Sequence, residues 1–135
     1  MKKQTILIAC ISLTLGLYSF TFLDQSTEWE VPESAQKVKN PTDADDKENL
    51  AIGKSLYSKY CQSCHGKEGF GDGSKAKEMK GDLGDFSAEE FQEQTDGTLF
   101  YKMTNGRDDM PNFEKKIVDE EDRWLIVNYL RTLKE

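Results

Sequence analysis

The stretch KYCQSCHGKEGFGDG, residues 59–73, decides how the rest of the chain is interpreted. Two cysteines, Cys61 and Cys64, stand three residues apart, and His65 directly follows the second of them. His65 is also the only histidine among the 135 residues of the chain. A lone histidine placed directly behind two cysteines indicates a site in which the three side chains act together.

Three kinds of site use cysteines at this spacing. A thioredoxin-like dithiol belongs in a β-α-β setting, which the surrounding sequence lacks, and it gives the histidine no role. A zinc site needs four ligands, and no cysteine or histidine follows His65. Covalent attachment of haem uses all three residues, because two thiols bond to the vinyl groups and the imidazole ligates the iron. The pattern therefore predicts one covalent haem c, with its iron, bound by Cys61, Cys64 and His65.

The ligand on the opposite side of the iron must be something other than a second histidine, and methionine is the usual choice. Met110 follows a turn-like polar stretch and precedes Pro111, an extended position from which a thioether could reach the iron. Met103 falls inside a predicted helix, where packing is its expected role, and Met79 lies in a lysine-rich loop. We predict Met110 as the second axial ligand, with Met103, Met79 or an open position as the alternatives.

The rest of the chain predicts short helices joined by glycine-containing loops, and no stretch is typical of a strand. A first helix is expected to begin at Asp45 or Asp46 and to continue through Cys64, because apolar residues recur at three- and four-residue steps. A second helix is expected over residues 95–105 and ends at Gly106, and the last helix follows the capping residue Asp119. These helices leave a thin core for about 90 residues, and a bound haem would add the missing apolar mass.

The N-terminus begins with Lys2 and Lys3, and residues 5–23 then contain no charged side chain. This length suits a helix that crosses a bilayer, and the two lysines place everything after it on the periplasmic or outer face of the cytoplasmic membrane. A cleaved signal segment and a lipid anchor at Cys10 are the alternatives, and both also export the domain.

Charge narrows the choice of partners. After Lys3 the chain has 16 basic and 25 acidic residues, a net charge of −9. Such a surface repels nucleic acid and anionic membranes, so contact with the membrane is expected only through the N-terminal helix. The expected partners are redox proteins, including a respiratory complex.

These observations divide the chain into three parts. Residues 1–23 form the membrane anchor or signal segment, residues 24–45 a polar linker interrupted by Pro32 and Pro41, and residues 46–135 the haem domain. Trp29, in the linker, is expected either at the membrane interface or docked on the domain.

Three segments in this order resemble the class I cytochromes c, the small monohaem electron carriers, and their membrane-anchored forms in particular. They are GKSLYSKYCQSCHG at 53–66, GRDDMPNF at 106–113 and EEDRWLIVNYLRTL at 120–133. The resemblance covers residues 46–135. It implies an all-α fold of a few helices wrapped around one covalently attached haem c, with His65 and Met110 as axial ligands.

The resemblance also implies particular contacts. The first and last helices should cross, with Gly53 permitting a close approach and Tyr57 facing Tyr129. In many relatives a proline stands at the position of Ser74, and a backbone carbonyl there holds the ring of the axial histidine; here a carbonyl is still available, but serine makes the loop less rigid. Trp124 is expected to pack between helices rather than beside the haem.

The function predicted from these residues is one-electron transfer in a respiratory chain, with the iron alternating between Fe(III) and Fe(II). We do not expect an enzyme, because no acid–base pair, nucleophile or substrate pocket is evident beyond the haem. One alternative is a haem c enzyme or gas sensor with an open sixth coordination position. The other is an electron-entry subunit held permanently in a respiratory complex.

Overall fold

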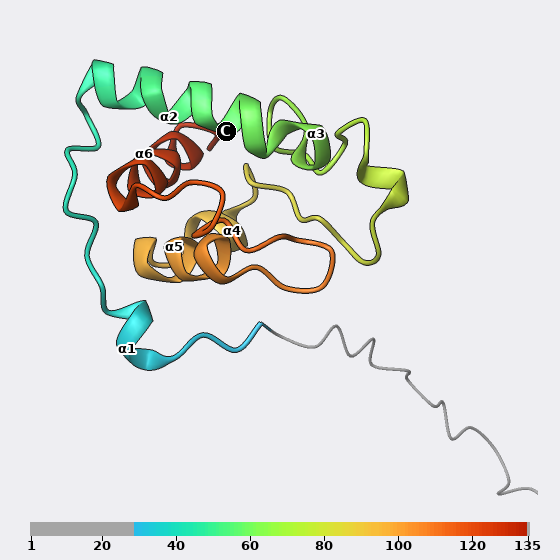
Figure 1. Ribbon diagram of the computed structural model, residues 1–135, viewed down its shortest axis with the longest axis horizontal. Helices are drawn as coiled ribbons and strands as arrows, with labels where there is room; N and C mark the ends of the chain where they lie inside the picture. The colour runs from blue at the N-terminus through green and yellow to red at the C-terminus, as the bar shows by residue number, and fades with distance from the viewer. Residues whose placement is uncertain (1–28, 135) are drawn as a thin grey trace, which may run out of the picture.

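The computed structural model of the chain describes residues 29–134, and this part is built from helices (Figure 1). Among these residues the pairing of β type is a single isolated bridge between Arg107 and Met110. The predicted all-α fold is confirmed. The elements are α1 (Glu33–Gln36), α2 (Lys47–Tyr60), α3 (Gln62–His65), the 3-10 turn η1 (Ala76–Glu78), α4 (Glu89–Gln92), α5 (Asp96–Asn105) and α6 (Glu120–Arg131).

Helix α2 lies across α6, and this crossing is the most extensive contact between two elements (Figure 1). Gly53 is buried at the crossing, where a Cβ atom would overlap the carbonyl oxygen of Leu125. One turn further along α2, the ring of Tyr57 lies 5.2 Å from that of Tyr129, at an angle of 54°. The expected crossing is therefore confirmed, because both of its contacts are present.

Side chains at the helix ends explain most of the boundaries. Asp46 caps α2 by accepting a hydrogen bond from the backbone N–H of Asn49 at 2.9 Å. Thr95 caps α5, which stops at Gly106, and Asp119 caps α6. These starts and stops are those expected from the sequence.

The expected continuation of the first helix through Cys64 is wrong. Helix α2 ends at Tyr60, and Cys61 leaves the regular helix with φ −114° and ψ −39°. A separate turn, α3, then carries Cys64 and His65. The apolar spacing of side chains runs on across this break, so it gives no sign of the change in the backbone.

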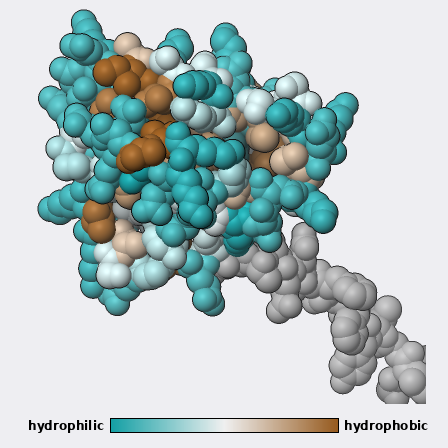
Figure 2. Space-filling view, in the orientation of Figure 1, coloured by the Kyte–Doolittle hydropathy of each residue, from teal (hydrophilic) through white to brown (hydrophobic). Residues whose placement is uncertain are grey.

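The core lies between α2, α5, α6 and the loops that connect them. Trp124 of α6 is only 1% exposed and stacks on Phe100 of α5, with 3.8 Å between ring centroids. The prediction that Trp124 packs between helices is confirmed. The face in Figure 2 is mostly hydrophilic, with a few separate hydrophobic patches. The other core side chains that are at most 9% exposed are Tyr57, Phe86, Leu99, Met103, Phe113, Ile117, Leu125, Ile126, Val127 and Leu130.

The predicted anchor over residues 5–23, and Cys10 within it, lie outside the described residues. No helix within residues 29–134 has the length and apolar character needed to cross a bilayer. The described part of the predicted linker lies along the domain, where α1 packs on α5 (Figure 1). Trp29 docks on the domain, one of the two placements expected for it, with the guanidinium of Arg107 4.6 Å from its ring centroid.

Candidate functional site

The backbone around His65 is fixed by the loop that follows it. The backbone N–H of Gly71 donates to the carbonyl of His65 at 2.9 Å, and that of Gly73 donates to the carbonyl of Cys64 at 3.1 Å. The hydroxyl of Tyr57 reaches over from α2 and donates to the buried carbonyl of Gly66 at 2.7 Å. The loop is therefore folded back on α3 and tied to α2 at the same time.

The imidazole of His65 lies against an aromatic ring. Phe86, itself 9% exposed, stacks on it with 4.4 Å between ring centroids and an angle of 29° between planes. The Nδ1 atom is buried and has no hydrogen-bond partner among the described residues. Burial lowers the pKa of His65, and a hydrogen bond with the Leu83 backbone partly opposes this shift. The ring is therefore neutral at pH 7, which is the form that ligates a metal.

Cys61 and Cys64 are both free thiols and both half-buried. Cys61 packs against the hydrophobic core, and its burial, with a smaller contribution from Cys64, raises the pKa of the Cys61 thiol to about 12. A thiol with this pKa is protonated at pH 7, whereas dithiol exchange needs a thiolate. Within residues 29–134 no group of three or more His, Cys, Asp or Glu side chains could hold a metal ion. The first observation disfavours the dithiol interpretation, and the second disfavours the zinc interpretation.

Met110 closes a short turn. Arg107 and Met110 exchange two backbone hydrogen bonds, from Arg107 N to Met110 O at 3.0 Å and from Met110 N to Arg107 O at 2.8 Å. Between them, Asp108 takes a left-handed backbone with φ 52°, a conformation that Asp tolerates better than most residues. The half-buried side chain of Met110 packs against the hydrophobic core, as Cys61 does.

A contact between aromatic rings brings the segment of Cys61 and the segment of Met110 to the same region. Tyr60, directly before Cys61, lies edge-on to Phe113, with 6.3 Å between ring centroids and an angle of 73°. Phe113 follows Met110 by three residues, so the cysteine segment and the methionine segment border one apolar region.

The alternative methionines have different surroundings. Met103 is 4% exposed and belongs to the hydrophobic core, which is the packing role expected for it. Met79 is half-buried at the end of η1, and the next residue, Lys80, donates its backbone N–H to a carboxylate oxygen of Asp109 at 2.7 Å. Met79 is therefore the alternative that lies beside the loop of Met110.

The residues present fit the predicted haem c. Two thiols that can bond to the haem, a neutral imidazole with a buried nitrogen that has no partner among the described residues, and a half-buried thioether are the groups that hold this cofactor. One contact of the relatives is absent: the Nδ1 atom of His65 accepts and donates no hydrogen bond among the described residues, so the carbonyl of Ser74 does not hold it. The backbone on either side of Ser74 instead hydrogen-bonds back to Cys64 and Ser63, which draws this loop onto the backbone of α3.

Three contributors to the site were missed in the sequence. Phe86 lies in a loop, and no periodicity signals that it stacks on His65. Tyr57 was expected only to face Tyr129, although a buried tyrosine usually needs a partner for its hydroxyl, and this could have pointed to the Gly66 carbonyl. The contact of Trp29 with Arg107 joins residues far apart in the chain and has no local signal.

Comparison with known proteins agrees with this description. Residues 48–130 match the protein family described as cytochrome c oxidase, cbb3-type, subunit III. A chain of the Kuenenia stuttgartiensis reducing HAO-like protein complex Kustc0457/Kustc0458 is similar in structure, with a TM-score of 0.60 and 25% identity. That match covers 70% of this chain but 50% of the other, so this chain spans about half of its length.

The KustC0563 c-type cytochrome has the same fold, with a TM-score of 0.52 and 24% identity over 62% of this chain and 98% of that one. No curated protein matches the chain.

Proposed function

Because this chain belongs to the family of cytochrome c oxidase, cbb3-type, subunit III, and is therefore a c-type cytochrome, we propose that it carries single electrons in a respiratory chain. In this proposal one haem c is bonded to Cys61 and Cys64 and ligated by His65 and Met110. The observation that carries the proposal is the half-buried, neutral imidazole of the only histidine, whose buried Nδ1 atom has no partner among the described residues.

Haem c, when bound, supplies a couple of ferric and ferrous iron that exchanges one electron. The side chains of this protein would set its behaviour. A neutral thioether from Met110, together with the imidazole of His65, would favour the ferrous form more than a second imidazole would. The apolar surface of Phe86 against His65 acts in the same direction, because it disfavours the extra positive charge of the ferric form.

The place of the protein in the cell is also part of the proposal. Residues 5–23 anchor the chain in the cytoplasmic membrane, and the haem domain lies on the periplasmic or outer face. Export as a soluble or lipid-anchored protein is the alternative. Only residues 24–28 separate the proposed anchor from Trp29, which is docked on the domain. They can span at most about 20 Å, so the electron partners would be proteins reached close to the membrane surface.

A permanent place in a larger complex is the second candidate function. One of the similar structures comes from a protein complex, and the short reach from the membrane would suit a fixed partner. Copurification from detergent-solubilised membranes separates the two candidates. A fixed subunit would elute with stoichiometric partners, whereas a mobile carrier would elute alone.

The spectrum of the reduced, haem-loaded chain tests the proposal. We expect a low-spin, six-coordinate haem that binds carbon monoxide slowly, because both axial positions are filled. Met110→Ala should open the site and make carbon monoxide binding fast, whereas Met79→Ala should leave it slow. Fast binding by the parent protein at neutral pH would contradict the proposal and favour a haem enzyme or a gas sensor. Fast binding by Met79→Ala alone would make Met79 the ligand.

A further inference from the structure

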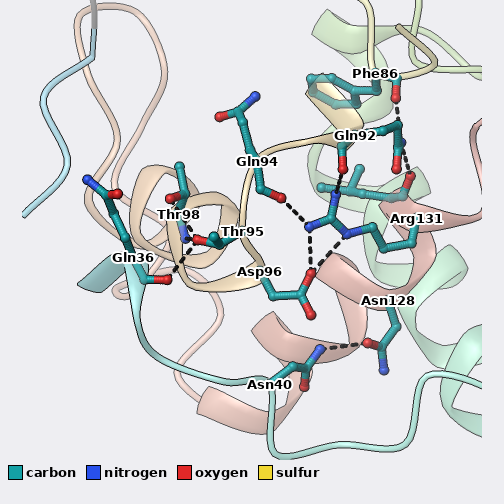
Figure 3. Close-up of polar contacts among 11 residues, drawn as sticks. Gln36, Asn40, Phe86, Gln92, Gln94, Thr95, Asp96, Thr98, Asn128 and Arg131 are labelled. Carbon is teal, nitrogen blue, oxygen red and sulfur yellow. Dashed lines mark hydrogen bonds and ion pairs between the residues drawn. The ribbon is translucent and has the colours of Figure 1, made fainter. Parts of the chain in front are cut away.

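Residues 29–43, named here the N-terminal strap, are built into the domain. The hydroxyl of Thr95, the cap of α5, donates to the carbonyl of Gln36 at 2.8 Å (Figure 3). The amide of Asn40 donates to the side-chain oxygen of Asn128 in α6 at 2.6 Å (Figure 3). These contacts join positions more than 50 residues apart, so they are tertiary contacts and not local turns.

Two features of the surface on which the strap packs indicate that it is part of the domain and not a passive linker. Gly97 of α5 is buried under it, where a Cβ atom would overlap the carbonyl oxygen of Ala35 and lie 2.7 Å from that of Val38. Asn128 is 2% exposed, and both ends of its amide are used by the strap, because its nitrogen donates to the hydroxyl of Thr42 at 2.9 Å. A buried amide without these partners would destabilise the domain.

The first residue of the strap, Trp29, lies against Arg107, at the start of the turn of residues 107–110, and against Lys102 of α5. The guanidinium of Arg107 is 4.6 Å from the centroid of its ring, and the ammonium of Lys102 is 5.7 Å from it. Both distances are within the range of cation–π attraction. Arg107 is also the residue that exchanges both backbone hydrogen bonds with Met110. Trp29 thus contacts the residue that forms the other end of the turn.

Two further side-chain contacts of the turn are exposed ones: the guanidinium of Arg107 pairs with Asp108 at 3.4 Å, and the backbone N–H of Lys80 donates to Asp109 at 2.7 Å. The turn is a single isolated bridge, and its two central residues, Asp108 and Asp109, are exposed. Short exposed elements of this kind open at low free-energy cost. A ring that holds Arg107 in place would make the opening less frequent.

We propose that Trp29 is a positioning residue for Met110. By holding Arg107, the strap keeps the turn of residues 107–110 closed and the thioether of Met110 on the iron. This inference rests on the proposed function, because it requires Met110 to be the axial ligand.

The displacement of Met110 from ferric iron by added imidazole tests the inference in the full-length, haem-loaded chain. Imidazole binds only after the thioether has left, so its binding rate reports how often the turn opens. Trp29→Ala should raise this rate by about two- to fivefold, the effect of losing one exposed cation–π contact. Trp29→Phe keeps an aromatic face and should restore a rate near that of the parent.

Matched variants separate positioning from general destabilisation. Lys37→Ala also lies on the strap, but its exposed side chain pairs with Glu33, so its rate should equal the parent rate. Arg107→Gln removes the cation and should raise the rate as Trp29→Ala does, and combining the two changes should add nothing further. The midpoint of denaturant unfolding should change little in Trp29→Ala, whereas a merely structural role would lower the midpoint without this selective increase in rate.

Two results would overturn the inference, and they differ from each other. If the parent binds imidazole slowly and both Trp29→Ala and Arg107→Gln bind it equally slowly, Trp29 does not position Met110. If the parent already binds imidazole as fast as Met110→Ala, then Met110 is not the ligand, and the proposed ligation fails together with the inference.

Discussion

The segment that carries His65 and the segment that carries Met110 are supported very differently. Next to His65, the loop hydrogen-bonds back onto α3, the hydroxyl of Tyr57 donates to a buried carbonyl, and Phe86 covers the imidazole. The turn before Met110 has one isolated bridge and exposed central residues. Two contacts reach it from distant parts of the chain: the ring of Trp29 lies against Arg107, and the backbone N–H of Lys80 donates to Asp109.

This difference suggests a division of roles. Local opening takes place where few buried contacts have to be broken. The turn that carries Met110 should therefore open far more often than the segment that carries His65. Changes near His65 should then act mainly on the stability of the whole domain. Changes near Met110 should act mainly on how easily an added ligand enters.

Removal of both cysteines that bond to the haem should have the largest effect on the site. The double change Cys61→Ala and Cys64→Ala removes the thiols, so haem should no longer be held covalently and both sides of the site should be lost. Extraction with acidified acetone measures this, because the colour of the parent stays with the protein. Cys10→Ala in the same full-length chain is the control and should keep its colour. Colour that stayed with the double variant would refute the attachment.

Gly53→Ala should have the next largest effect, because it forces a methyl group into the carbonyl of Leu125. Alanine favours a helix by about 1 kcal/mol over glycine. Overpacking at a tight crossing costs roughly 1–3 kcal/mol or more and should dominate. Denaturant unfolding should therefore show a net loss of stability, with no selective gain in the imidazole binding rate. Lys54→Ala, exposed on the same helix, should change little, and a Gly53→Ala protein as stable as the parent would contradict the crossing.

Tyr57→Phe tests a single hydrogen bond of the segment that carries His65. It removes the hydroxyl that donates to the carbonyl of Gly66 and leaves that carbonyl buried without its donor, at an expected cost of about 1–3 kcal/mol in unfolding free energy. Tyr129→Phe, the matched change in the facing ring, should cost less. The imidazole binding rate should stay at the parent value in both variants. A raised rate with unchanged stability would mean that Tyr57 supports the methionine side instead.

Asp109→Ala should have the smallest effect on stability. Unlike Tyr57→Phe, it should change the imidazole binding rate. It removes the acceptor of the Lys80 backbone N–H, an exposed contact whose loss should cost less than about 1 kcal/mol. The same change frees the turn beside Met110, so the imidazole binding rate should rise. Asp109→Asn keeps an acceptor oxygen and should stay close to the parent. Equal rates in all three proteins would show that this contact does not support the turn.

Local patterns were sufficient to predict several parts of the fold. The caps Asp46 and Asp119 and the stop at Gly106 were predicted because each acts on backbone groups within a few residues of itself. The crossing at Gly53 followed from the resemblance to a known family. The break at Cys61 was missed, because side-chain spacing is the same on both sides of it.

The amino-acid sequence by itself determined the chemistry of the site. Two thiols and an imidazole within five consecutive residues need no distant contact to be placed side by side. Only the tertiary structure decided that Phe86 covers His65, that Trp29 reaches Arg107 and that Asn128 receives the strap. Each of these contacts joins residues far apart in sequence, and its formation depends on how the helices pack. The same holds for Met110, whose role the sequence could predict by elimination but whose position depends on a turn that Trp29 and Lys80 contact from distant parts of the chain.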